Sequence, residues 1–308
     1  MAEELNYRRN IIASSLVRQQ TKVLGLLIPC VTFSFFPDIA RAVEDTARED
    51  GYHVLLCHSD DSVEREHEEI ELLRGYQVAG LIITPAHDRG DEETDIFLQL
   101  KKDKVPFVLI DKFIEGLDCN FVGVDDRAGA YEAVSHLIGL GHKRIAYISG
   151  AKNASTNKGR LQGYEEALRD NNITLEPELT AGDGWLEEDG YKAGRTLLEL
   201  APEKRPTAIF AVNDLCAFGV LQAIKEKGLK VPEDVALIGF SDVKAASIAT
   251  VSLTTVRQPT REIGKQAVRI LLEEIENRTS DMKTKKVILK PELVIRKSCG
   301  AFGNKSCR

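Results

Sequence analysis

Short apolar segments alternate along the chain with longer segments in which apolar residues recur at helical spacing. The apolar segments are rich in β-branched residues, which predicts strands at 23–28, 53–57, 80–84, 107–110, 145–148, 207–212 and 235–239. The amphipathic segments predict helices at about 36–50, 62–75, 92–104, 127–140, 158–171, 188–200 and 214–227. Near-continuous apolar strands alternating with helices are typical of parallel sheets covered on both faces.

These strands are too many for one small sheet, so the pattern predicts an α/β protein with two similar, doubly wound sheets. The chain continues beyond them. Residues 254–259 are predicted to be extended, 260–275 helical, and 286–289 and 293–296 extended again. Extra strands after a complete second set suggest that the chain crosses back to the first lobe.

The composition is that of an ordinary globular protein, with 43% hydrophobic and 29% charged residues among 308. No apolar run approaches the roughly 20 residues that a membrane helix needs. The first twenty residues are polar and basic, which predicts no signal peptide. The net charge of −7 argues against a large nucleic-acid surface on the globular part.

Six cysteines show no paired spacing: Cys30, Cys57, Cys119, Cys216, Cys299 and Cys307. Most lie in or beside apolar segments, so we expect reduced side chains that pack as small apolar groups in a cytoplasmic protein.

Polar and aromatic residues follow the predicted strands. Open α/β sheets bind ligands outside the carboxyl ends of their strands, so these residues are candidate ligand contacts. They are Phe33, Phe35, Phe36, Asp111, Lys112, Asp125, Trp185, Asn213, Asp214, Ser241 and Asp242, together with Arg160 after a polar loop. Rings stack on flat faces, and amide, carboxylate and guanidinium groups bind hydroxyls. The set predicts a polyol or heterocycle in a cleft between two lobes.

Motifs of common enzyme chemistry do not occur in the sequence. It has neither standard phosphate-binding glycine loop and no Gly-x-Ser-x-Gly elbow. The histidines have no metal-ligand spacing that stands out, and the acidic pairs Asp60-Asp61 and Asp125-Asp126 are interpreted as loop and cap residues. We therefore expect no catalysis, no cofactor and no metal.

Blocks of residues spread over most of the chain resemble the lactose/galactose repressor (LacI/GalR) family of bacterial transcription regulators. They are Asn6–Leu16, Thr21-Lys22 before Val23–Leu26, Val124-Asp125-Asp126 with Gly129, His136-Leu137-Ile138, Leu140–Ala146, Gly159–Tyr164, Val212-Asn213-Asp214 with Ala217 and Gly219, Val231–Val235, Ile238-Gly239-Phe240 and Leu253–Val256. Each block is weak by itself. Together they follow the family's order and spacing from residue 5 to about 297, which makes the resemblance specific.

The resemblance implies a periplasmic-binding-protein-like core of type I, with two lobes joined by three crossovers. One lobe would comprise 21–124 with 258–288 and the other 125–257 with 289–300, followed by a tail at 301–308. It also implies a homodimer that senses a sugar or similar small polar effector and binds operator DNA, most simply as a repressor.

Family members carry a helix-turn-helix head before this core. Residues 1–5 resemble the end of that head, most of which is missing, so we expect a truncated chain. In relatives the next segment forms a hinge helix in the DNA minor groove, where a leucine matching Leu16 wedges a base step. Ala13 would share a face with Leu16. For this chain alone we expect a disordered polar leader, because one short helix is marginal in water.

The resemblance also assigns roles within the cleft. Arg160 would face the ligand with its planar donor fork, and Thr156 and Lys158 match loop positions that line the pocket in relatives. Trp185 would stack on the ligand ring. Asn213 would bind ligand, although it also suits a helix N-cap.

Other candidates leave alternatives open. Phe35 and Phe36 match first-lobe contacts, though one of them could fill the core. Many relatives have an acidic residue where Ser241 stands, so Asp242 could supply the missing carboxylate. Asp111 and Lys112 could form an ion pair across the cleft or touch ligand. Asp125 at a crossover and Asp214 as a cap suit structural roles.

Two rival functions remain. A periplasmic solute-binding protein of the same fold would need a secretion signal, and neither the start of the sequence nor the Asn6–Leu16 block fits one. A core that senses a partner protein, instead of or alongside a small molecule, is the other alternative.

Overall fold

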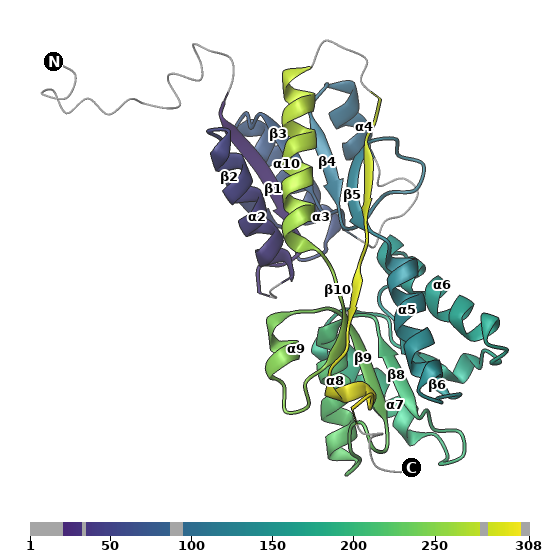
Figure 1. The fold of residues 1–308 in the computed structure, drawn as a ribbon. Coiled ribbons are helices and arrows are strands. Elements are labelled where there is room, and N and C mark those ends of the chain that lie inside the picture. Colours follow the sequence, from purple (N-terminus) through teal and green to yellow (C-terminus); the bar gives the residue numbers. More distant parts are fainter. Residues whose placement is uncertain (1–20, 33–34, 87–94, 278–282, 303–308) are drawn as a thin grey trace, which may run out of the picture.

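The apolar segments form two six-stranded sheets, one in each of two α/β lobes that are stacked end to end (Figure 1). The computed structural model describes residues 21–32, 35–86, 95–277 and 283–302. Within these ranges, no helix is both long and apolar enough to cross a lipid bilayer.

The first lobe is built on a parallel sheet in the order β11-β5-β4-β3-β1-β2. Its strands are β1 (Val23–Ile28), β2 (His53–His58), β3 (Gly80–Ile83), β4 (Phe107–Ile110), β5 (Asn120–Val124) and β11 (Lys286–Leu289). Its helices are α2 (Phe35–Glu49), α3 (Val63–Gly75), α4 (Asp95–Lys102) and α10 (Thr260–Glu276). β3 and β4 are buried at every position, as expected for a sheet covered on both faces.

The second lobe has the sheet order β12-β10-β9-β8-β6-β7, parallel except for β12, which runs antiparallel to β10. Its strands are β6 (Ile145–Ile148), β7 (Thr180–Ala181), β8 (Ala208–Ala211), β9 (Ala236–Ser241), β10 (Thr254–Arg257) and β12 (Glu292–Val294). Its helices are α5 (Asp126–Gly139), α6 (Ser155–Asp170), α7 (Glu187–Glu199), α8 (Asp214–Glu226) and α9 (Lys244–Ile248), with 3₁₀ turns at Pro177–Leu179 and Lys297–Cys299.

The chain passes between the lobes three times. It leaves the first sheet between β5 and α5, returns between β10 and α10, and crosses again between β11 and β12 (Figure 1). The predicted fold class, two doubly wound parallel-sheet lobes with three crossovers, is confirmed.

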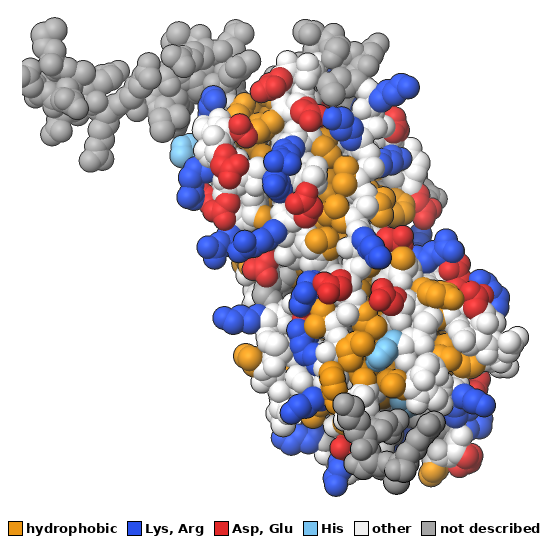
Figure 2. Space-filling model, viewed as in Figure 1, with side chains coloured by type: hydrophobic (Ala, Val, Ile, Leu, Met, Phe, Trp, Pro, Cys, Tyr) orange, Lys and Arg blue, Asp and Glu red, His pale blue; other side chains and the backbone are white. Residues whose placement is uncertain are grey.

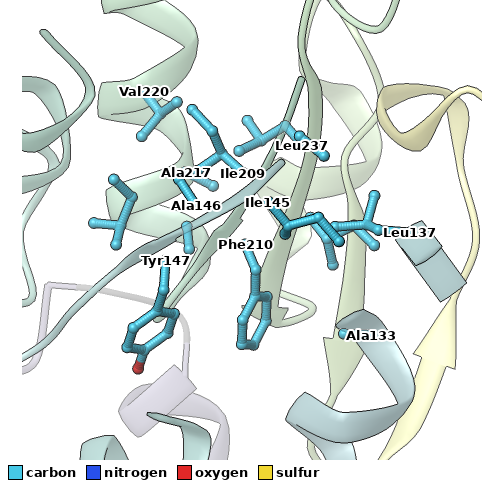
Figure 3. Close-up of a cluster of buried hydrophobic side chains, with 14 of the residues drawn as sticks. Ala133, Leu137, Ile145, Ala146, Tyr147, Ile209, Phe210, Ala217, Val220 and Leu237 are labelled. Atoms are coloured by element: carbon cyan, nitrogen blue, oxygen red, sulfur yellow. The ribbon is translucent and has the colours of Figure 1, made fainter. Parts of the chain in front are cut away.

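A large apolar cluster forms the core of the second lobe, where side chains of β6, β8 and β9 meet those of α5 and α8 (Figure 3). Tyr147 stacks on Tyr164 with ring centroids 5.4 Å apart and donates a 2.8 Å hydrogen bond to Asn157 Oδ1. Asn157 Oδ1 also accepts from Gly150 N at 2.9 Å. The core thereby fixes the loop that precedes α6 at the face toward the first lobe.

Glycines allow close packing of α7 against α8. A Cβ atom on Gly219 would lie 1.9 Å from Glu187 O, and one on Gly190 would lie 2.1 Å from Cys216 O. These contacts hold the N-terminal ends of α7 and α8 together, next to Trp185 and Asn213.

Several elements differ from the sequence pattern. Neither the two-residue strand β7 nor the five-residue helix α9 was predicted. β5 was not predicted, because it is short and Gly123 interrupts its apolar run. α6 begins at Ser155, three residues before its predicted start. On the face shown in Figure 2, acidic and basic side chains are interspersed over both lobes.

Candidate functional site

A cavity of about 130 Å³ lies between the lobes, where strands of both sheets end. This is the place at which open α/β sheets bind ligands. From the first lobe it is lined by residues that include Phe35, Phe36, Asp61, Asp111 and Lys112. From the second lobe Thr156, Arg160, Trp185, Asn213 and Ser241 reach it, and Gln258 lines it from the second crossover.

Arg160 is held rigidly at the cavity wall. Its Nε donates to Asp126 Oδ1 at 2.8 Å and its Nη1 to Val212 O at 2.7 Å, while Nη2 lies 2.8 Å from Asp126 Oδ1. The guanidinium carbon sits 3.9 Å from the centre of the Phe240 ring. Burial raises the pKa of Asp126, although Arg160 opposes that shift. Among the described residues, these contacts engage three of the five guanidinium N–H groups, which leaves two for a ligand.

Asn213 and Trp185 form one unit. Asn213 caps α8, since its Oδ1 accepts from Cys216 N at 2.8 Å, and its Nδ2 donates to Trp185 O at 2.9 Å. The indole ring lies against Gly150, where a Cβ atom would come within 2.8 Å of it. Glycine at this position allows the ring to rest on the backbone, so an aromatic surface forms part of the cavity wall.

Asp214 is fully buried behind this wall. Its carboxylate accepts from Val243 N at 2.9 Å and from Thr255 Oγ1 at 2.5 Å, which ties α8 to β10 and to the loop after β9. The prediction that Asp214 caps a helix was therefore wrong, because the N-cap of α8 is Asn213. Burial raises the pKa of Asp214 to about 6, and the two hydrogen bonds limit the shift.

Asp214→Asn should remove part of the pH dependence of stability. The pKa of Asp214 is about 6 in the folded state, against about 4 in an unfolded chain. The folded state therefore binds this proton more tightly, and the stability it contributes below pH 4 is lost as the pH rises through 6. Wild type should lose about 2 kcal/mol relative to the variant between pH 4 and pH 7. Urea unfolding at both pH values measures this, and a pH-independent difference would contradict it.

Ser241 and Asp242 end β9 in positive-φ conformations of 127° and 55°, which are rare for residues other than glycine. Ser241 Oγ accepts from Gln258 Nε2 at 3.1 Å and lines the cavity. Asp242 instead pairs with Arg296 at 2.6 Å and Arg257 at 2.7 Å. Its carboxylate is thus neutralised by two arginines, one at the end of β10 and one just beyond β12.

The part of the cavity wall that the first lobe forms contains both a basic side chain and acidic side chains. Lys112 is buried and pairs with Asp61 at 2.6 Å, so this ion pair lies within one lobe rather than across the cleft. Asp111 has a positive φ of 64°, and burial raises the pKa of its carboxyl. Phe35 and Phe36 meet edge to face, with ring centroids 4.9 Å apart.

Thr156 and Lys158 point different ways although both lie in the first turn of α6. Thr156 is buried and lines the cavity. Lys158 is half exposed and pairs with Glu115 of the first lobe at 3.1 Å. Asp125, which was expected to be structural, caps α5 by accepting from Ala128 N at 2.9 Å.

The described residues form no disulfide and no cluster able to hold a metal. The five cysteines among them are free. In this part of the chain, no group of three or more His, Cys, Asp or Glu side chains is arranged as a metal site.

Known proteins are similar to this chain over almost its whole length. A family model described as a periplasmic binding protein-like domain matches residues 134–299. The HTH-type transcriptional repressor PurR of Haemophilus influenzae is 33% identical over 299 residues, which cover 96% of this chain and 87% of the repressor. The HTH-type transcriptional regulator DegA of Bacillus subtilis is 31% identical, with 96% and 86% covered.

Solved structures have the same architecture. A regulatory protein of the LacI family from Chloroflexus aggregans is 30% identical with a TM-score of 0.78, over 90% of this chain and 98% of that one. The chain belongs to the LacI family of transcriptional regulators. CcpA of Lactococcus lactis, also 30% identical, has a TM-score of 0.80 over the same shares.

Membership of the LacI family confirms the resemblance stated from the sequence blocks. The homologues of this chain are transcriptional repressors. The chain contains the effector-binding core of such a regulator, which senses a small metabolite.

The predicted ligand contacts of this LacI-family core come together with two exceptions. Phe35, Phe36, Asp111, Lys112, Thr156, Arg160, Trp185, Asn213 and Ser241 all line the cavity, whereas Lys158 and Asp242 do not. Their contact with a ligand stays a prediction. Phe33 and the hinge residues Ala13 and Leu16 lie outside the described residues.

Among the lining residues of the LacI-family core that were missed are one amide and one carboxylate, Gln258 and Asp61. Gln258 directly follows β10, so the rule about strand ends would have found it. Asp61 lies three residues beyond β2 and was interpreted as a loop residue. Its position carries no periodic signal in the sequence.

Proposed function

We propose that this chain is the sensing and dimerising core of a cytoplasmic repressor and is not an enzyme. Its effector would be a sugar or a similar small polar metabolite held in the cavity between the lobes. The full-length protein would act on operator DNA as a homodimer, with Ala13 and Leu16 in the hinge segment.

The observation that carries this proposal is the wall made by Arg160 and Trp185. Two N–H groups of a fixed guanidinium remain for hydroxyl or carbonyl oxygens, next to an indole on which a ring can stack. Similar proteins support a sugar. CelR, 28% identical with a TM-score of 0.82 over 96% of this chain, was solved as a complex with cellobiose. A ribose operon repressor of Haemophilus influenzae is 31% identical.

The cavity is lined from both lobes, so a ligand in it would contact both. Such a ligand stabilises the lobe arrangement that completes its contacts and shifts the population toward that arrangement. In the proposed mechanism, the shift changes how the two hinge segments of a dimer are presented to DNA.

Thr156→Ala should weaken effector binding, whereas Lys158→Ala should leave it unchanged. A thermal-shift screen against pentoses, hexoses, disaccharides, nucleosides and purines identifies the effector, because a ligand that binds only the folded state raises the melting temperature. Losing one buried hydrogen-bonding group should weaken binding by about tenfold. The half-exposed Lys158, two residues away, is the matched control. Equal shifts for both variants and wild type would place the effector elsewhere.

A further inference from the structure

A second, larger cavity lies behind the loop that joins β4 to β5, at residues 111–119. Its volume is about 500 Å³, compared with about 130 Å³ for the cavity between the lobes. The loop forms one wall, β5 and the edge strand β11 contribute another, and Asp126 reaches it from the second lobe. It lies at the β11 edge of the first sheet, opposite the β2 edge.

The walls of this second cavity are mainly apolar. Phe113, Phe121 and Ile288 are among them, and Phe113 packs edge to face on Phe121 with centroids 5.7 Å apart. Phe113 is nevertheless 49% exposed and Ile288 is 55% exposed. Covering such side chains with the apolar part of a ligand is favourable, because it removes their surface from water.

The charges around the second cavity are unbalanced. Four carboxylates and one ammonium group line it: Asp111, Glu115, Asp118, Asp126 and Lys286. Arg160 pairs with Asp126 and Lys158 pairs with Glu115, while the positive charges of Lys112 and Arg160 act on Asp111 from the side of the effector cavity. Lys286 is the one cationic side chain in the lining of the second cavity. Among the described residues, the Asp111 carboxylate makes no hydrogen bond and no ion pair, so it is the natural partner for a cationic group.

We propose that this second cavity is an accessory site for a small organic cation, a primary amine carried on an aromatic or branched apolar body. The apolar body lies against Phe113 and Ile288, and the ammonium group neutralises the carboxylate of Asp111. A neutral or anionic ligand of the same shape lacks the second of these interactions.

The accessory site is placed to influence the effector cavity, because Asp111 lines both cavities and Asp126, which lines the accessory site, pairs with Arg160 of the effector cavity. Its loop also touches the second lobe: Phe113 N donates to Ser155 Oγ at 3.1 Å, and Glu115 pairs with Lys158 at 3.1 Å. A cation behind the loop therefore changes the charge beside Arg160 and stabilises the loop in contact with α6.

Binding of 2-phenylethylammonium tests this proposal, with 2-phenylethanol and phenylacetate as neutral and anionic probes of matched shape. At saturation, the cation alone should raise the melting temperature of the chain, by about 2–4 °C.

A matched pair of variants locates the bound cation. Ile288→Arg adds a positive charge at the cavity wall and should weaken binding by about tenfold or more. Leu98→Arg, at a 51% exposed apolar position of α4 outside the cavity, should leave it unchanged. Equal shifts with all three probes, or binding retained in Ile288→Arg, would each overturn the proposal. None of these results depends on whether the effector cavity binds a sugar.

Discussion

Replacing Arg160 by leucine is expected to lower the free energy of unfolding by about 3–5 kcal/mol. Arg160 is only 3% exposed, and its guanidinium group neutralises the buried carboxylate of Asp126. Its loss leaves that charge without a partner and Val212 O without a donor. Urea unfolding monitored by circular dichroism measures the change.

The double variant Arg160→Leu/Asp126→Leu is the control for this effect. Removing both charges avoids an unpaired buried ion, so the double variant should be more stable than Arg160→Leu alone. If Arg160→Leu were as stable as wild type, the ion pair would not be the buried, structural element that holds the cavity wall. Because this variant disturbs folding, Thr156→Ala is the better probe of ligand contact.

Gly219→Ala is expected to destabilise the second lobe by about 3 kcal/mol. A Cβ atom at this position would lie 1.9 Å from Glu187 O and 2.5 Å from Tyr191 N, so backbone would have to move. Such a movement would separate the ends of α7 and α8, and with them the hydrogen bond from Asn213 to Trp185 O. Effector affinity should therefore fall together with stability.

Gly139→Ala is the matched control for Gly219→Ala. Gly139 is exposed in α5, and a Cβ atom there would meet nothing within 4 Å. Alanine in a helix is favoured over glycine by about 0.5–1 kcal/mol, so this variant should be slightly more stable than wild type. If both substitutions had the same effect, close packing of α7 on α8 would not be what requires Gly219. Differential scanning calorimetry of both variants decides this.

The repeating pattern of strands and helices predicted the two-lobed fold, because a buried parallel strand and an amphipathic helix each have a strong local signature. β5 was not predicted, because Gly123 interrupts the apolar pattern of a strand that has only five residues. The rule that ligands bind beyond strand ends found most of the cavity, because that rule depends only on the order of elements and not on detailed packing.

The exceptions have separate physical causes. Thr156 and Arg160 are four residues apart and share a face of α6, whereas Lys158 lies between them and must point away. A helix start predicted at 155 would have excluded Lys158. Asp242 pairs instead with Arg257 at the end of β10 and with Arg296, two residues beyond β12. Pairings between residues so far apart leave no trace in local sequence.

The emission of Trp185 gives the most direct test of whether the cavity between the lobes is the effector site. As the only tryptophan of the chain, it reports on that cavity alone. We expect the sugar or related metabolite that raises the melting temperature to change the emission of Trp185 saturably, with the same midpoint as its binding isotherm. A metabolite that binds and stabilises the chain without any change in Trp185 emission would show that the effector site lies elsewhere.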